Sequence, residues 1–450
     1  MAKDIEATPR NSTSVDEEMR SLKIQVSETD RAEDVHIDGD QSKFSAMLGI
    51  LRKFIGVSDI ISMRLSLPSQ LLDPIPNLEY WNYMDRPEYF VRISESDDEV
   101  ERMLAMLAWW FSKLLKHKGK VLKPFNSVLG EQFFCRWQVG GSSADREDTA
   151  SSSSTNETLG EGTASSETSS SSSNSGSGGG ATATVEYITE QISHHPPVSA
   201  FVYRCKERGI EAAGYDHISA KFTGLSATVA TGSHCKGIFV TLKHRDDEAY
   251  LGVHPMANIV GWLRGSLKVQ LVESSYIVCE KTGLATIIEF KEERWFGKNK
   301  ENVTGKVFRY DAAKYGDQIA QWKLKDIPKS CTVVATFGGN WDKRVAVKRT
   351  GSQERTLIDM TDLEVAVKIV KPLEEQGEME SRKIWNPVAA SMLQGKFGEA
   401  TQLKRDIEDR QRKLAAARKE RDESFVPALF KAESQIEGRP ELLESAPVNI

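Results

Sequence analysis

The sequence has few cysteines, and they are spread along the chain. There are five in 450 residues, an odd number, and none of them forms a CxxC pair. This excludes a disulfide framework and a structural zinc site of the usual spacing. The positions are Cys135, Cys205, Cys235, Cys279 and Cys331.

Long apolar runs are also missing. The N-terminus has no apolar signal core, and no stretch reaches the length that spans a bilayer. We therefore expect a cytosolic protein. The net charge of −6 gives the molecule as a whole no attraction for nucleic acid. An anionic partner would have to be bound by a local basic patch.

Two stretches lack the apolar residues that a core needs. Residues 1–40 are polar and charged, and residues 140–180 form a Ser/Gly/Thr tract without one aromatic side chain. Neither can bury enough surface to offset the entropy of ordering, so we predict that both are disordered. The tract separates two strand-like runs, FFCRWQV and TATVEYIT, and the whole insertion is placed at residues 140–182. We predict an insertion at a hairpin tip and no domain linker there.

An amphipathic stretch at residues 43–62 precedes the main body of the chain. Its apolar residues recur at helical spacing, which predicts one apolar helix face ending near Gly56. These residues are Phe44, Met47, Leu48, Leu51 and Ile55. Two interpretations stay open: an ordinary core helix, or a helix that covers a site or lies on a membrane surface.

The remaining chain shows three patterns. The run DDEVERMLAMLAWWFSKLLKHK predicts a buried helix with an acidic start and a basic end. From about 130 to 350, short runs rich in Val, Ile, Thr, Phe and Tyr alternate with turn residues. Helical periodicity returns beyond 370 and ends in a highly charged helix. The fold class predicted is β-rich α+β, with a large antiparallel, near-closed β-barrel that could enclose a cavity.

The segment EQISHHPP places His194 and His195 at the end of a predicted strand, followed by two prolines. Successive strand side chains point to opposite faces, so we expect the two imidazoles to diverge. No HxH, HxxxH or acidic partner completes a metal site, and no GxSxG or paired carboxylates indicate acid–base catalysis. Two interpretations remain open from the residues alone: structural histidines at a strand end, or donors to an anion such as phosphate.

The longer stretch EQISHHPPVSAF resembles the fingerprint EQ-x-SHHPP of the oxysterol-binding-protein-related family of lipid-transfer proteins. Two further stretches resemble family motifs. LKPFNSVLGE at 122–131 is similar to KP-x-NP-x-LGE, with Ser127 where a proline is usual, and KPLEEQGEMESRKIW at 371–385 is similar to KPLEEQ…SRK-x-W. The resemblance covers roughly residues 44–425, interrupted by the insertion.

The resemblance implies a many-stranded barrel that holds one lipid in a tunnel, with an N-terminal lid. It places a single lipid-binding domain at 41–425, and the segment from Phe44 to Ile55 becomes the lid candidate. The parts implied are a lid at 41–67, a helical segment at 68–120, the barrel at 121–370, a C-terminal helical region at 371–425 and a tail at 426–450.

The resemblance also implies a site for the headgroup of phosphatidylinositol 4-phosphate. Lysine, arginine, histidine and asparagine suit a polyanionic headgroup rich in hydroxyls. The last three residues of the set form a Lys-x₃-Glu-x₃-Arg run on one helix face, which by itself would indicate only exposed ion pairs. The implied set is Lys123, Asn126, His194, His195, Lys404, Glu408 and Arg412.

The function implied is the exchange of a sterol for phosphatidylinositol 4-phosphate between membranes, without covalent chemistry, cofactor or metal. We expect a cytoplasmic monomer that touches membranes only peripherally, for instance at membrane contacts. Phosphatidylserine is the alternative counter-lipid, because AWWFSKLLKHKG does not reproduce the polar–aromatic pair of the sterol-contacting members. A lipid sensor with little net transfer is the alternative from another class.

Overall fold

The computed structural model describes most of the chain from Ser69 onward and a few positions before it. Residues 1–48 and most of the predicted insertion lie outside the described part. The described residues are 49, 52, 53, 55–57, 59, 61, 67, 69–118, 122–140, 182–223, 226–261, 267–291, 301–316, 318–448 and 450.

The β-rich part is one 15-stranded antiparallel sheet in the described chain. Hydrogen-bonded neighbours follow the order β1-β2-β3-β4-β6-β7-β10-β11-β12-β13-β14-β15, and β5, β8 and β9 branch off from β4. The strands are β1 (Gln132–Val139), β2 (Ala183–His194), β3 (Pro197–Cys205), β4 (Ile210–Phe222), β5 (Ala227–Thr231), β6 (Ile238–Leu242), β7 (Glu248–Val253), β8 (Met256–Val260), β9 (Lys268–Val272), β10 (Ser274–Cys279), β11 (Leu284–Phe290), β12 (Val303–Arg309), β13 (Thr332–Gly339), β14 (Arg344–Arg349) and β15 (Arg355–Asp359).

The longer helices precede and follow the sheet, as the sequence patterns predict, and only short helical turns lie between the strands of the described chain. The α-helices are α3 (Asn77–Tyr80), α4 (Pro87–Val91), α5 (Glu99–Ser112), α6 (Ala312–Tyr315), α7 (Ser381–Leu393) and α8 (Phe397–Glu420). Short 3-10 turns are η1 (Ser69–Leu71), η2 (Arg92–Ser94), η3 (Leu115–Lys118), η5 (Lys206–Arg208), η6 (Lys243–Arg245), η8 (Ile319–Gln321) and η9 (Leu373–Glu375). The predicted α+β class with one large antiparallel sheet is confirmed.

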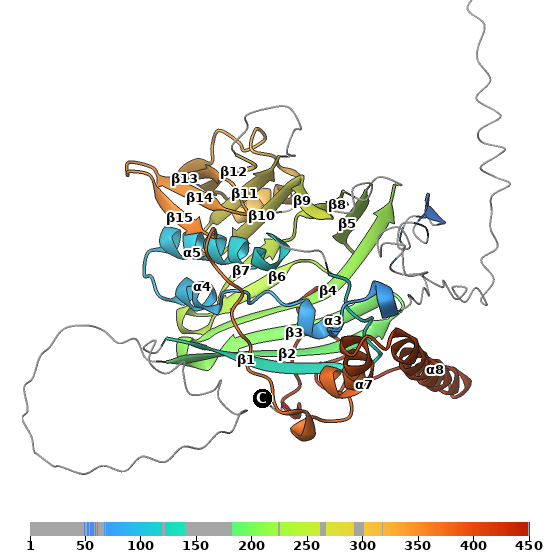
Figure 1. The fold of residues 1–450 in the computed structure, drawn as a ribbon. Coiled ribbons are helices and arrows are strands. Elements are labelled where there is room, and N and C mark those ends of the chain that lie inside the picture. The colour runs from blue at the N-terminus through green and yellow to red at the C-terminus, as the bar shows by residue number, and fades with distance from the viewer. Residues whose placement is uncertain are drawn as a thin grey trace, which may run out of the picture.

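The sheet curls around helix α5. Figure 1 shows β1–β4 on one side of α4 and α5 and β10–β15 on the other. No hydrogen bond joins β1 to β15 in the described chain, and the segment after β15 crosses back to β1, where Ile369 pairs with Arg136. The first and last strands of the sheet are therefore not paired with each other, and the segment after β15 bridges back to β1 instead.

Helix α5 is buried in the concave side of the sheet. Trp109, Trp110 and Phe111 are fully buried, as the nearly all-round apolar pattern of this helix predicts. The Trp110 ring packs against Gly252 of β7, where a Cβ atom would lie only 2.5 Å from the ring. A glycine is required at this point so that the helix can approach the strand closely.

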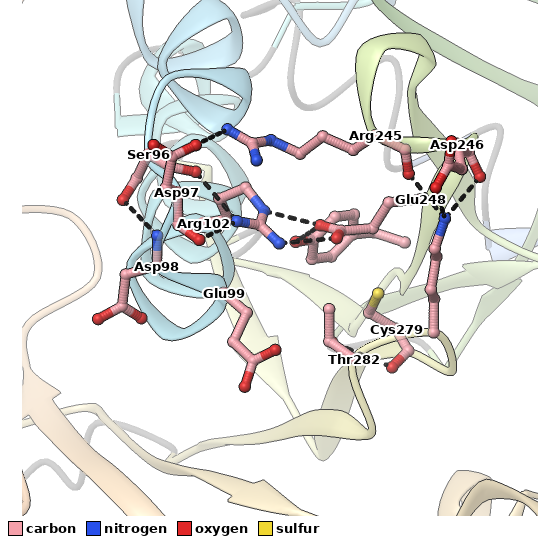
Figure 2. Close-up of polar contacts among 12 residues, drawn as sticks. Ser96, Asp97, Asp98, Glu99, Arg102, Arg245, Asp246, Glu248, Cys279 and Thr282 are labelled. Carbon is pink, nitrogen blue, oxygen red and sulfur yellow. Dashed lines mark hydrogen bonds and ion pairs between the residues drawn. The ribbon is translucent and has the colours of Figure 1, made fainter.

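Charged groups fix the first turn of α5 to the sheet (Figure 2). Arg102 donates two hydrogen bonds to the carboxylate of Glu248 in β7, at 2.7 and 2.8 Å, and both side chains are almost completely buried. Arg245 of η6 pairs with Asp97 at 2.9 Å. A buried pair of this kind is costly to break, because either partner alone would be an uncompensated charge. The buried Arg102–Glu248 pair therefore orients α5 against β7, and the acidic residues at the start of the helix complement its dipole.

The C-terminal segment, set apart as a tail in the sequence, packs on the outer face of the sheet. Leu429 and Phe430 are at most 1% exposed. Their cluster includes Phe134 and Ile188 of β1 and β2. The carboxylate of Glu190, from the EQ of the motif, accepts hydrogen bonds from the backbone N–H groups of residues 428 and 429, both at 2.8 Å. The motif strand β2 is thus covered on its outer side by residues beyond 425.

We predict that this C-terminal packing contributes to stability. Leu429→Ala or Phe430→Ala removes a buried side chain and should lower the free energy of unfolding by about 3 kcal/mol each. Urea unfolding measures the change. Val426→Ala is the control, because Val426 is 74% exposed and its loss should change stability by less than about 0.5 kcal/mol. Equal, small effects of all three variants would show that the segment is only loosely attached.

Candidate functional site

The histidine pair lies at the tip of the β2–β3 hairpin. Strand β2 ends at His194 and β3 begins at Pro197. His194 is half-buried and His195 is exposed. Their ring centroids are 4.5 Å apart with an interplanar angle of 58°. The expectation that the two imidazoles diverge is therefore wrong. His195 lies in the turn and not in the strand, so the alternation of strand side chains no longer applies to it, and the two rings lie side by side.

The loop at 122–131 presents Lys123 and Asn126 together. The Lys123 ammonium donates to the Asn126 side-chain oxygen at 2.9 Å. The backbone of the loop is held by Asp73, whose carboxylate accepts from the Lys123 N–H at 2.8 Å. Burial, together with the charge of Lys404, lowers the pKa of Lys123 to about 8. Two cationic side chains from distant parts of the sequence are thus close enough to affect one another.

Helix α8 supplies the second lysine. Lys404 is 4% exposed and donates to Glu408 at 2.6 Å, so the predicted i, i+4 pair is formed. Burial lowers the pKa of Lys404, and Glu408 opposes that effect. Arg412 lies one turn further, 61% exposed, and contacts Glu408 and Asp409. The helix therefore places Lys404 near Lys123 and leaves Arg412 toward solvent.

A buried carboxylate assembles these parts. Glu131 is completely buried and accepts hydrogen bonds from Val128 N at 2.9 Å, Ser381 Oγ at 2.6 Å and Trp385 Nε1 at 3.0 Å. Ser381 and Trp385 belong to α7, which packs on α8. The Phe125 ring stacks on Trp385 with centroids 4.8 Å apart. The 122–131 loop and the α7–α8 pair are consequently one packed unit.

The amphipathic N-terminal stretch is described only in part. Phe44, Met47, Leu48 and Leu51 lie outside the described residues. Ile55 is 54% exposed and lies in a turn just before Gly56, whose φ of +91° favours glycine.

The segment after this turn contacts the sheet near the histidine hairpin. The carboxylate of Asp59 accepts from Ala220 N of β4 at 3.0 Å. The pairing of β4 with β3 ends at His217 opposite Val198, one residue after the hairpin turn. Asp59 therefore lies along β4 just beyond the tip of the hairpin.

A polar cluster on the inner side of the sheet is absent from the sequence prediction. Tyr83 donates to Asp216 of β4 at 2.5 Å, and Lys113 lies 3.2 Å from His254 Nδ1. Desolvation raises the pKa of Asp216 to about 7 and lowers that of Lys113 to about 7. The only sequence signal was Lys113 itself, a single charge directly after the apolar middle of α5.

Three of these groups combine accessible surface with strong desolvation. Tyr83, Asp216 and His254 are half-buried, yet loss of solvent shifts the pKa of Tyr83 well upward and that of His254 well downward. Desolvation is the first cause of the shift in each of these groups.

Comparison with known proteins places the chain in a family. The model of the oxysterol-binding protein family matches residues 46–398. The chain belongs to this family of lipid-binding proteins. It is 41% identical to oxysterol-binding protein-like protein 1 of Schizosaccharomyces pombe, over 90% of each chain. It is also 27% identical to human oxysterol-binding protein-related protein 9, over 90% of this chain but 49% of the human protein.

Solved structures show the same fold. The chain resembles the Osh1 ORD domain in complex with ergosterol with a TM-score of 0.59 and 20% identity, covering 88% of this chain and 85% of that one. It resembles the Osh3 ORD of Saccharomyces cerevisiae in complex with PI(4)P with a TM-score of 0.57 and 17% identity, covering 89% and 90%. Within the described ranges, no helix is long and apolar enough to cross a bilayer. The same residues contain no cluster of three or more potential metal ligands.

We predict a pH-dependent contribution of Glu131 to stability. Burial raises the pKa of Glu131 from 4.5 to about 7, so the protonated form is favoured in the folded protein. This stabilising contribution is complete below pH 4.5 and is lost as the pH rises through about 7. Between pH 5 and pH 8, wild type should lose roughly 1–3 kcal/mol relative to Glu131→Gln. Urea unfolding at both pH values tests this, and parallel profiles would contradict it.

Proposed function

We propose that the protein exchanges a sterol for phosphatidylinositol 4-phosphate between membranes, using one lidded tunnel and no covalent step. The proposal is supported by the effect of Lys404 on Lys123 and by the backbone hydrogen bonds that join the end of the Lys123 loop to Gln191, three residues before His194. A phosphate there receives two lysine charges and imidazole donors, and Asn126 can bond inositol hydroxyls. Lys404 is paired with Glu408, and a phosphate beside Lys123 would add a second anion to these two lysines.

The solved relatives support both ligands. Osh1 ORD structures exist with ergosterol and with cholesterol, and an Osh3 ORD structure exists with PI(4)P. If one tunnel takes either lipid, the two compete, and a gradient of the phosphoinositide drives the other lipid by mass action. Such an exchanger works as a monomer in the cytosol and touches membranes only peripherally.

A sterol is the better candidate than phosphatidylserine for the counter-lipid. The inner cluster around Tyr83, Asp216 and Lys113 has pKa values of about 7 for both the acid and the amine, so each readily becomes neutral. A hydroxyl can donate to one group and accept from the other without bringing a net charge into the protein. A serine headgroup would bring three charges into the same place.

The stretch from Phe44 to Ile55 is proposed as the lid. The position of Asp59 against Ala220 brings the chain that follows this stretch to the histidine hairpin. A lid there would cover both the headgroup site and the entrance for the acyl chains or the sterol. Its apolar face would cover the bound lipid and meet the bilayer when the lipid leaves.

The first test separates the two ligands. Replacing both His194 and His195 with Ala should abolish extraction of phosphatidylinositol 4-phosphate from vesicles and change sterol binding less than about twofold, because only the charged lipid reaches the hairpin. Fluorescent sterol binding and phosphoinositide extraction are measured on the same preparations. His244→Ala, at an exposed histidine in η6, is the control. Equal loss of both lipids would refute a separate headgroup site.

Phosphoinositide binding should also depend on pH through Lys123. The free pKa of about 8 rises when a phosphate binds, so binding takes up a proton only at higher pH. Affinity should be nearly constant from pH 6.8 to 7.5 and fall above pH 8 by up to about tenfold per pH unit. Extraction assays between pH 7 and 9.5 show this fall. In Lys123→Ala the fall should be shallower, and an unchanged slope would show that another group titrates.

The counter-lipid is tested at Asp216. Asp216→Leu should weaken sterol binding about tenfold, because the sterol hydroxyl loses a hydrogen-bond partner. Asp216→Asn keeps an acceptor of the same size and should stay near wild type. Phosphoinositide extraction should be unaffected by either change. If no variant binds sterol, and phosphatidylserine binding is near wild type in Asp216→Asn but weakened in Asp216→Leu, phosphatidylserine is the cargo instead of a sterol.

A further inference from the structure

The motif around the histidine pair contains two buried polar residues, Glu190 and Gln191, and the role of Gln191 is unassigned. Gln191 stands three positions before His194 and is 2% exposed. The β2–β3 register shifts between Gln191 and Ser193, so the strand carries a β-bulge immediately before the histidines. Bulges turn the side chains that follow them, and this one has to be held in place for the hairpin tip to have a fixed direction.

The Gln191 side chain spans the bulge. Its Nε2 donates to the Ser193 carbonyl at 2.7 Å, and its Oε1 accepts from Ser199 Oγ of β3 at 2.7 Å. Ser193 Oγ in turn donates to the Pro196 carbonyl at 2.7 Å, across the turn. A chain of three hydrogen bonds thus runs from β3 through Gln191 to the proline that follows His195.

The Gln191 backbone connects the same hairpin to the lysine loop. Its N–H donates to the Glu131 carbonyl and its carbonyl accepts from Gly130 N, both at 2.8 Å. The neighbouring Glu190 points to the other face, where it holds residues 428 and 429. Gln191 is therefore the point at which the loop of Lys123 and the hairpin of His194 are joined.

We propose that Gln191 is a positioning residue of the phosphoinositide headgroup site, and this rests on the function proposed above. It contacts no lipid; it sets the direction of the histidine hairpin relative to Lys123. A primary amide is required because one group must donate to Ser193 and accept from Ser199 at once. Glutamate can accept only, and leucine can do neither, so each leaves a buried partner unsatisfied.

The test compares Gln191→Glu with Ser199→Ala, which removes one bond and leaves the amide in place. Gln191→Glu should weaken phosphoinositide extraction about tenfold and Ser199→Ala about threefold, both with sterol binding within about twofold of wild type. In a Gln191→Leu background, Ser199→Ala should have no further effect. Gln376→Glu is the control for a new buried carboxylate, since Gln376 is 7% exposed and its amide donates to the Lys371 carbonyl.

The outcomes are separable. Folded variants that extract phosphoinositide like wild type, or that lose both lipids equally, overturn the role of Gln191. If Gln191→Glu does not fold, the test relies on Ser199→Ala alone. Phosphoinositide extraction by Ser199→Ala that equals wild type then refutes the positioning role of Gln191. If wild type extracts no phosphoinositide, or if the double alanine variant at 194 and 195 still extracts it, the proposed function fails and the role of Gln191 fails with it. Loss confined to the charged lipid is the result that supports the role.

Discussion

The candidate site depends on one buried carboxylate, that of Glu131. Three donors surround it, from its own loop and from α7. Its backbone carbonyl also accepts from β2. The loop of Lys123, the histidine strand and the α7–α8 pair are far apart in sequence, and Glu131 lies where all three meet. Burying a carboxyl group is costly without such partners, so its environment has to form as a whole.

The result of this assembly is an arrangement of cations that the fold alone would not favour. Lys123 and Lys404 are held near one another while both are partly or wholly buried, and both have a lowered pKa. An anionic headgroup would offset the repulsion between the two lysines. Because the lysines are already held in place in the free protein, binding costs less conformational entropy. The inner cluster near Asp216 has another character: desolvation raises the pKa of Asp216 and lowers the pKa of Lys113.

Much of this could be predicted from the sequence. Strand periodicity predicted the antiparallel sheet, and the all-round apolar run predicted the buried α5. The lysine, asparagine and histidine positions came from family motifs, since each of them alone has an ordinary surface interpretation. The geometry of the His194–His195 rings was mispredicted because strand alternation stops at the turn. The packing of Phe430 on β1 and β2 and the pairing of Tyr83 with Asp216 are contacts between distant segments, and no local pattern encodes them.

Exchange of the two lipids is tested most directly by following both of them in one experiment. Donor vesicles carry phosphatidylinositol 4-phosphate, acceptor vesicles carry a sterol, and the transfer of each lipid is recorded with and without the opposing one. Each lipid should move faster when the other is supplied on the opposite side, because the two compete for one tunnel. Binding of both lipids with no net transfer in either direction would contradict exchange and would indicate a lipid sensor.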